Sequence, residues 1–288
     1  MTKFLLGIIF ASAFATAILN VSFADNIHDF QTKKVRVNDI YIAYKIFGKG
    51  DPIVLINGFT NTLDDWPPIL LDKLAENHTV ITFSNRVVGN TSTGDKGFSI
   101  KQFAQDTSDL LDALNINKTD VLGFSMGARV AQELTLSNPE KIDKLIIYAS
   151  GCGGKQGTPA DKEVMKVLSD KNIDPSEIKT KLRPLLYPEG FDFSILPKSE
   201  EKVSDRTILE QQRAIVNWPG VCNKLKNIEK ETLVIVGSDD NLAPPANSLL
   251  MSQKIPGSWL VQISGAGHAL AMQMPIKFSN IVLVFLES

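Results

Sequence analysis

The spacing of apolar residues changes several times along this chain, and each change predicts an element of secondary structure. Apolar and polar residues alternate at 35–37 and 41–46 around Asn38-Asp39, which predicts a β-hairpin. Short apolar runs predict the other strands, and the uninterrupted ones are typical of strands buried on both faces. These runs are Ile53–Ile56, Thr79–Phe83, Val121–Leu122, Lys144–Ala149, Thr232–Val236 and Trp259–Ile263.

Helical spacing separates most of these strands. Between 100 and 114, Phe103, Leu110, Leu111 and Leu114 recur at helical intervals. The other helices expected in this part of the chain are Thr62–Leu74, interrupted at Trp66-Pro67-Pro68, and those near Arg129–Leu134, Pro245–Lys254 and Ala269–Leu286. Strands that alternate with helices predict an α/β fold, with a mostly parallel central sheet, helices on both faces and the hairpin at one edge.

The alternation of strand and helix stops for about 75 residues after Ala149. We expect a core made of residues 25–150 and 228–288, and a helical cap made of residues 151–227. Helical stretches are expected at Pro159–Ser169 and Arg206–Asn217. Large apolar residues favour a cap over a pocket rather than a surface excursion: Leu185, Leu186, Tyr187, Phe191, Phe193 and Trp218.

The first 24 residues have the pattern of a secretory signal peptide. One lysine precedes an apolar run from Phe4 to Leu19, and Ser22-Phe23-Ala24 offers a small-x-small cleavage site before Asp25. We expect export to the periplasm or the medium, with no stable membrane insertion once the leader is removed. The alternative is an uncut N-terminal membrane anchor. In an oxidising compartment Cys152 and Cys222 could form a disulfide or stay as two buried thiols.

Composition narrows the function classes. The chain has 288 residues, of which 43% are hydrophobic and 22% charged, and its formal net charge of −2 comes without a basic stripe. Nucleic acid is therefore an unlikely partner, and a small-molecule substrate is expected. No metal-ligand cluster or phosphate-binding loop is visible, so we expect no metal and no cofactor.

The stretch Gly123-Phe124-Ser125-Met126-Gly127 carries the clearest chemical signal. It follows a short apolar strand and precedes a good helix former, so Ser125 is expected in a sharp strand-to-helix turn. Glycines two residues before and after the serine allow strand and helix to approach closely. This is the context of a nucleophile elbow, in which a serine hydroxyl projects above the sheet.

A serine nucleophile needs a base, and the chain has three histidines. His28 lies beside the leader, and His78 precedes an inner strand, which places it at the amino end of the sheet. His268 follows the last strand in a glycine-rich loop and is the expected base. The acid that orients its imidazole is expected in the loop after Val236, where Asp239 and Asp240 are both candidates.

The tetrahedral intermediate of acyl transfer also needs hydrogen-bond donors for its oxyanion. We expect the backbone N–H groups of Met126 and Phe59 to supply them. The polar and glycine-rich segments all follow strands, at the sheet edge where ligands bind in such folds. They are Asn57, Ser84–Gly97, Ser125, Ser150–Gly154, Asp239-Asp240 and His268.

These motifs together resemble the α/β-hydrolase superfamily over nearly all of the chain after the leader. The residues that carry the resemblance are Gly123–Gly127, Gly237-Ser238-Asp239-Asp240, Gly267-His268, Asn57-Gly58-Phe59 and Asn85–Thr91. The resemblance implies a Ser125-His268-Asp240 triad, because the spacing from Gly237 selects Asp240 over Asp239. Three positions depart from the family pattern: Asn57 replaces a histidine, Ser84 an aspartate and Val87 a glycine.

A serine hydrolase acting on small, mainly apolar esters is the function that this resemblance implies. Ser125 argues against the dehalogenases and epoxide hydrolases of the superfamily, whose nucleophile is an aspartate. Lactonases, C–C bond hydrolases and cofactor-free perhydrolases use the same serine and stay open as alternatives. So does a ligand-binding protein on the same fold.

Overall fold

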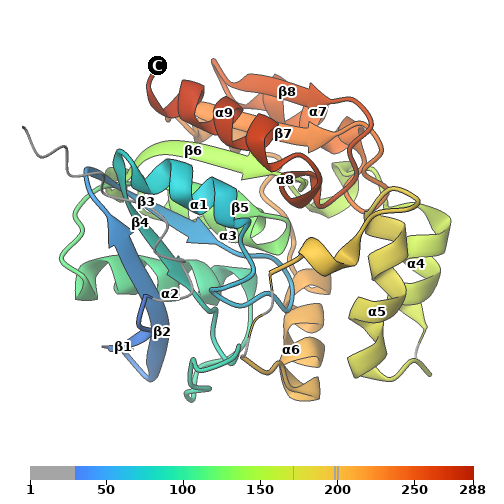
Figure 1. The fold of residues 1–288 in the computed structure, drawn as a ribbon, viewed down its shortest axis with the longest axis horizontal. Coiled ribbons are helices and arrows are strands. Elements are labelled where there is room, and N and C mark those ends of the chain that lie inside the picture. The colour runs from blue at the N-terminus through green and yellow to red at the C-terminus, as the bar shows by residue number, and fades with distance from the viewer. Residues whose placement is uncertain (1–29, 171, 198, 200) are drawn as a thin grey trace, which may run out of the picture.

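The computed structural model describes residues 30–288, except 171, 198 and 200. The predicted signal peptide, residues 1–24, lies outside these residues. Within them the chain folds as a central sheet with helices on both faces, and a group of further helices stands beside one end of the sheet (Figure 1). The α/β fold expected from the sequence is therefore correct.

The sheet has eight strands in the order β1-β2-β4-β3-β5-β6-β7-β8. The predicted hairpin forms the antiparallel edge, because β1 pairs with β2 and β2 with β4 in antiparallel fashion, whereas all later pairs are parallel. The strands are β1 Lys33–Val37, β2 Ile40–Gly48, β3 Asp51–Ile56, β4 His78–Phe83, β5 Thr119–Phe124, β6 Ile142–Tyr148, β7 Thr232–Gly237 and β8 Trp259–Ile263.

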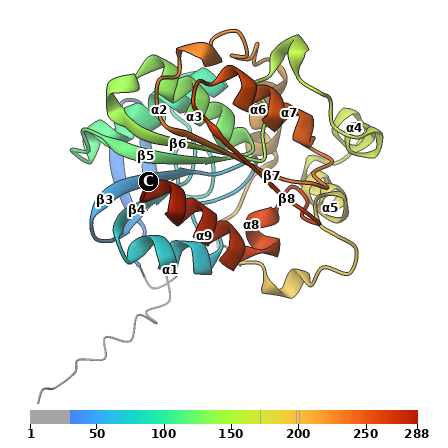
Figure 2. The ribbon, with the colours of Figure 1, turned by 90° about the horizontal axis from the view of Figure 1, so that it is seen from above.

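Alternating residues of the inner strands belong to two apolar layers, one on each face of the sheet. On one face Val54 and Ile56 of β3 belong to the same cluster as residues of α2, α3 and α7, and on the other Ile53 and Leu55 belong with α1, α8 and α9. Figure 2 shows these two groups of helices on opposite sides of the sheet. The helices are α1 Pro68–Ala75, α2 Ile100–Ala113, α3 Met126–Ser137, α7 Pro245–Lys254, α8 Leu270–Gln273 and α9 Pro275–Leu286.

Two predicted helices were wrong in part, and proline is the reason in both. The helix expected over 62–74 begins only at Pro68, since a proline is well placed in the first turn but excludes the helical conformation from the residue before it. The helix expected over 269–286 is two helices, and Met274 between them has φ −134° and ψ 58°. Pro275 starts α9 in the same way as Pro68 starts α1.

The described part of residues 151–227 contains three α-helices, α4 Lys162–Ser169, α5 Pro175–Leu186 and α6 Asp205–Val216. The sequence pattern indicated α4 and α6 but not α5. Val164, Ile178, Leu182 and Ile208 form a small apolar cluster of their own between these helices. A disulfide joins Cys152 and Cys222, whose Cα atoms are 4.9 Å apart, at the base of this segment.

Candidate active site

Ser125 lies in a strained turn between β5 and α3. Its φ of 53° and ψ of −113° are rare for a residue with a side chain. The neighbouring glycines permit the turn, because a Cβ on Gly123 would lie 2.6 Å from the carbonyl oxygen of Gly127, and one on Gly127 only 2.0 Å from that of Ile56. The Ser125 N–H donates to the Tyr148 carbonyl at 2.9 Å, and its carbonyl accepts from the Ser150 hydroxyl at 2.8 Å.

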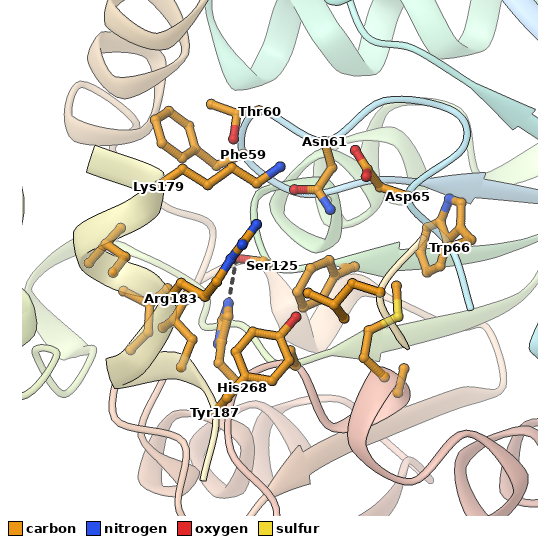
Figure 3. A pocket seen from close by; sticks show the side chains of 18 of the residues that line it. Phe59, Thr60, Asn61, Asp65, Trp66, Ser125, Lys179, Arg183, Tyr187 and His268 are labelled. Carbon is orange, nitrogen blue, oxygen red and sulfur yellow. Dashed lines mark hydrogen bonds between the residues drawn. The ribbon is translucent and has the colours of Figure 1, made fainter. Parts of the chain in front are cut away.

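The structure brings Ser125, His268 and Asp240 together from three separate loops. The Oγ of Ser125 lies 3.0 Å from Nε2 of His268, as the dashed line in Figure 3 marks. The Nδ1 of His268 lies 2.9 Å and 3.0 Å from the two carboxylate oxygens of Asp240. Asp240 also accepts the N–H groups of Leu242 and Ala243. The exposed Asp239 instead accepts from the Ser238 hydroxyl and makes no contact of this kind with the histidine.

Tyr148 fixes the loop that carries His268. Its buried hydroxyl donates to the His268 carbonyl at 2.9 Å and accepts the Ala271 N–H at 3.0 Å. Burial raises the pKa of this hydroxyl well above its usual value, so it stays a neutral donor. Phe124 stacks on the tyrosine ring with centroids 4.7 Å apart and lies 5.3 Å from the imidazole. Tyr148 thus holds the backbone of His268, and the Phe124 ring lies against one side of the imidazole.

The turn after β3 supplies the expected oxyanion donor. The side chain of Asn57 stabilises this turn, because it accepts a hydrogen bond from the Gly58 N–H at 2.9 Å and donates one to the Thr62 carbonyl at 2.9 Å. A Cβ on Gly58 would lie 3.4 Å from the Cβ of Ser125, so the turn passes beside the serine. Within the described part of the chain, the N–H groups of Phe59 and Met126 have no hydrogen-bond acceptor. Two free donors beside the serine are what an oxyanion site requires.

A residue of α6 holds the same turn from outside. The N–H of Thr60 donates to Oε1 of Gln211 at 2.7 Å, across 151 residues of sequence. Thr60 has a φ of 59°, in the left-handed region that β-branched residues rarely adopt, and Gln211 is completely buried. The strained residue next to the expected oxyanion donor therefore depends on a side chain from the predicted cap.

Further polar contacts fasten Glu201 and Thr207 to the loop after β4. Glu201 accepts from the Ser84 hydroxyl at 2.6 Å and from the N–H of Asn90 at 3.1 Å. The Thr207 hydroxyl donates to the carbonyl of Val87 at 2.7 Å. Two of these positions depart from the superfamily pattern. Val87 keeps a φ of 63°, which suits the glycine usual there, and a carboxylate from the predicted cap bonds Ser84, where the family has an aspartate.

Arg86 anchors that loop to the core. Its buried guanidinium forms ion pairs with Asp39 at 2.9 Å and with Asp106 at 2.7 Å. The guanidinium and two backbone N–H groups hold the pKa of Asp39 well below its usual range. The loop therefore offers a fixed surface on which residues of the predicted cap can dock.

A pocket of about 160 Å³ opens in front of Ser125 and His268. Core residues such as Trp66, Phe124 and Tyr148 line one part of it, and the predicted cap lines another with Leu182, Leu186, Tyr187, Leu196 and Pro197. A cavity near 150 Å³ accommodates a benzene ring, so the space suits a small apolar group. Two cations of α5, Lys179 and Arg183, also line it, and the sequence analysis did not identify them.

Sequence reasoning also missed Tyr148 and Gln211, because each acts through a contact with a residue far away along the chain.

Over the described residues, no group of three His, Cys, Asp or Glu side chains is arranged to hold a metal ion. None of the helices in residues 30–288, with the three gaps, is long and apolar enough to cross a membrane.

Known proteins resemble this chain over most of its length. A family model described as the alpha/beta hydrolase fold matches residues 51–171. The chain is 28% identical to the "Putative non-heme bromoperoxidase BpoC" of Mycobacterium tuberculosis over 263 residues, which cover 86% of this chain and 98% of that protein. It is 27% identical to a poly(3-hydroxyalkanoate) depolymerase of Ectopseudomonas oleovorans, over 82% of this chain and 84% of that one.

Among solved structures, the esterase EaEST of Exiguobacterium antarcticum superposes with a TM-score of 0.78 at 20% identity, over 90% of this chain and 100% of that one. At this level of identity the likeness concerns the fold. The family model, the curated relatives and the shared fold agree with one another. Residues 51–171 match this family model, and the chain has the α/β-hydrolase fold.

Proposed function

We propose that this protein is an exported serine hydrolase that cleaves small, mainly apolar esters through an acyl-enzyme, with Ser125, His268 and Asp240 as its catalytic triad. The observation that carries the proposal is the chain of contacts from Ser125 Oγ to His268 Nε2 and from His268 Nδ1 to Asp240. The two acceptor-free N–H groups beside Ser125 support it.

The geometry suits acyl transfer in two halves. With Nδ1–H donating to Asp240, Nε2 takes the Ser125 proton while Oγ attacks the ester carbonyl. The N–H groups of Phe59 and Met126 stabilise the oxyanion, and protonated His268 then gives its proton to the departing alcohol. In the second half His268 takes a proton from water, the hydroxide attacks the acyl group, and the proton returns to Ser125 as the acid leaves.

The pocket supports the choice of substrate size. Trp66, Phe124 and Tyr148 give its core part an aromatic surface, and burial of each CH₂ group contributes about 0.8 kcal/mol to binding. A short acyl or aryl group fits the available volume, whereas a folded polypeptide does not. The name of one relative, a depolymerase of a polyester, is consistent with ester cleavage.

Export rests on two observations of different kinds. The sequence pattern of the first 24 residues is that of a cleaved leader, and the Cys152–Cys222 disulfide is of the type that persists in oxidising compartments. Secretion of a chain whose first residue is Asp25, measured by mass spectrometry, is the expected result. A chain retained with the membrane fraction and still carrying Phe4–Leu19 would contradict it.

The experiment for the activity is an ester panel with Ser125→Ala as the paired variant. We expect the wild-type protein to hydrolyse short aryl and alkyl esters and to react with a fluorophosphonate probe. Loss of a triad serine lowers kcat by about 10⁴–10⁶. The variant should keep its circular dichroism and thermal midpoint, because the hydroxyl faces a pocket. Ester hydrolysis that persists in the folded variant would refute the role of Ser125, and a folded wild-type protein that does not react with the probe would favour a binding function.

A further inference from the structure

One face of α5 points into the pocket and combines apolar with cationic side chains. The pocket-lining residues of this helix are Lys179, Leu182, Arg183 and Leu186. Their spacing of three, one and three residues puts them on a single helical face. In Figure 3, Lys179 and Arg183 extend from the helix toward the space in front of Ser125. Two exposed cations therefore lie beside the site, on the same helical face as Leu182 and Leu186.

These cations differ from the other charged residues of the same helix. Lys181 forms an ion pair with Glu177 at 3.0 Å, one turn away on the outside. Neither Lys179 nor Arg183 makes an ion pair with any residue that the structure describes. The Arg183 guanidinium stacks over the Phe193 ring at 5.4 Å, which orients it without neutralising its charge.

The rest of the lining leaves the charge largely uncompensated. Asp65 is the one acidic residue among the described residues that line the pocket. One of its oxygens already accepts the N–H and the hydroxyl of Thr62 at 2.8 Å and 3.1 Å. Burial raises the pKa of Tyr187 to about 12, so this neighbour is uncharged at neutral pH. Two cations and one anion leave the mouth of the pocket with a net positive charge.

We propose that Lys179 and Arg183 bind a carboxylate that the substrate carries on one side of its scissile ester. The inference rests on the proposed hydrolase function and adds a substrate class to it. Lys179 and Arg183 are separated by one helical turn, so a carboxylate can lie between them and accept two hydrogen bonds that the guanidinium of Arg183 donates. In the view of Figure 3 the helix that carries Lys179 and Arg183 lies on one side of Ser125, and Trp66 lies on the other. The favoured substrate is thus a half-ester, apolar at one end and anionic at the other.

Two matched pairs of esters test this inference, because the charge can sit on either side of the bond. Monoethyl glutarate and the ethyl ester of glutaramic acid differ only in carboxylate against amide on the acyl side. The acetate esters of 4-hydroxybenzoate and 4-hydroxybenzamide do the same on the alcohol side. We expect kcat/KM to favour the anionic member of at least one pair by about tenfold or more, mostly through KM.

The variants Lys179→Gln and Arg183→Gln should each reduce that preference by about three- to tenfold, because kcat/KM falls more for the anionic ester than for the neutral one. Lys181→Gln is the matched control on the same helix and should change neither value. Because exposed charges are screened, the preference should also shrink between about 20 mM and about 500 mM salt. Glutarate should inhibit hydrolysis of the neutral ester competitively, and Arg183→Gln should weaken that inhibition.

The outcomes separate this inference from the proposed function. If the neutral esters are hydrolysed with no preference for the anionic ones, or with a preference that both variants retain, the carboxylate site is refuted while the hydrolase stands. If wild-type protein cleaves no ester, the proposed function fails and the inference fails with it, unless glutarate still protects Ser125 from the fluorophosphonate. Such protection, lost in Arg183→Gln, would support the anion site without ester cleavage.

Discussion

The core and the predicted cap position their side chains by different means. In the core, most residues of β3, β5, β6 and β7 are buried, and Ser125 and Asp240 lie just beyond the ends of β5 and β7. In the segment 151–227, Trp218, Val221 and Leu225 belong to the core cluster. Helices α4, α5 and α6 have a small apolar cluster of their own, and hydrogen bonds of Glu201, Thr207 and Gln211 join this part of the segment to the core loops.

The difference suggests a division of labour. Packing of a sheet against helices fixes the proposed triad to within fractions of an ångström, which bond making requires. Polar contacts on loops are easily exchanged, so the residues that they carry can change with the substrate while the chemistry stays the same. The predictions below test this division, in order of their expected effect on activity.

The largest effect is expected for the acid in the core. Asp240→Asn should lower kcat by about 10⁴, because an amide cannot stabilise the imidazolium and favours the wrong tautomer of His268. Asp239→Asn is the matched control, since that side chain is exposed and bonds only Ser238. Steady-state kinetics on one neutral ester are the measurement. A larger loss in Asp239→Asn than in Asp240→Asn would move the role of acid to Asp239.

An intermediate effect is expected where the predicted cap meets the core. Gln211→Met removes the acceptor for the Thr60 N–H and should let the neighbouring Phe59 N–H drift from the oxyanion position. Loss of a complete oxyanion donor costs about 10²–10³ in kcat, so partial displacement should cost about tenfold, with a smaller change in KM.

Gln212→Met gives the control for this effect, because Gln212 bonds the Leu168 carbonyl within the predicted cap. If both variants lose thermal stability but only Gln211→Met loses kcat, Gln211 is a positioning residue. Equal kinetics in the two variants would show that the strained turn holds its shape without the cap.

The smallest effect on activity is expected at the other end of the sheet. Burial, reinforced by Asp143 nearby, raises the pKa of Asp120 from 3.8 to about 6. The folded state therefore holds this proton more tightly than the unfolded state. Stability from this group is greatest at low pH, declines as the pH rises from about 4 to about 6, and stays low above that range.

Asp120→Asn should then raise the free energy of unfolding by about 1–3 kcal/mol at about pH 7.5 and by almost nothing at about pH 4. The amide oxygen can still accept the Lys144 N–H that Asp120 accepts at 3.0 Å. Thermal or urea unfolding at both pH values measures the effect, and kcat/KM should not change. A stabilisation that is equal at the two pH values would mean that the proton on Asp120 is not its source.

The sequence predicted the core well because its signals are local. The elbow and the alternation of strand and helix both follow from residues within a few positions of one another. The geometry around Asp240 has the arrangement that the spacing from Gly237 implied, although its catalytic role stays a prediction. Local signals failed where proline changed a helix start, as at Pro68 and Pro275.

Most of what the pattern missed lies in the predicted cap. Helix α5 was not predicted because Pro184 interrupts its pattern near its end and its apolar stripe contains Lys179 and Arg183. Gln211 and Tyr148 act on residues that are 151 and more than 100 positions away, so only the folded chain shows their partners. A cation on an otherwise apolar helical face is therefore a sequence pattern that can indicate a residue lining a pocket.

The disulfide has a consequence for proteolysis. It closes a loop over a sequence separation of 70, which contains all three helices of the predicted cap. A protease that cuts this loop once divides the chain between Ser125 on one fragment and Asp240 with His268 on the other. The bond between Cys152 and Cys222 keeps the two fragments in one covalent molecule. The cap of a nicked protein would thus be interrupted by the cut. Its nucleophile and its base could nevertheless not diffuse apart until the disulfide is reduced.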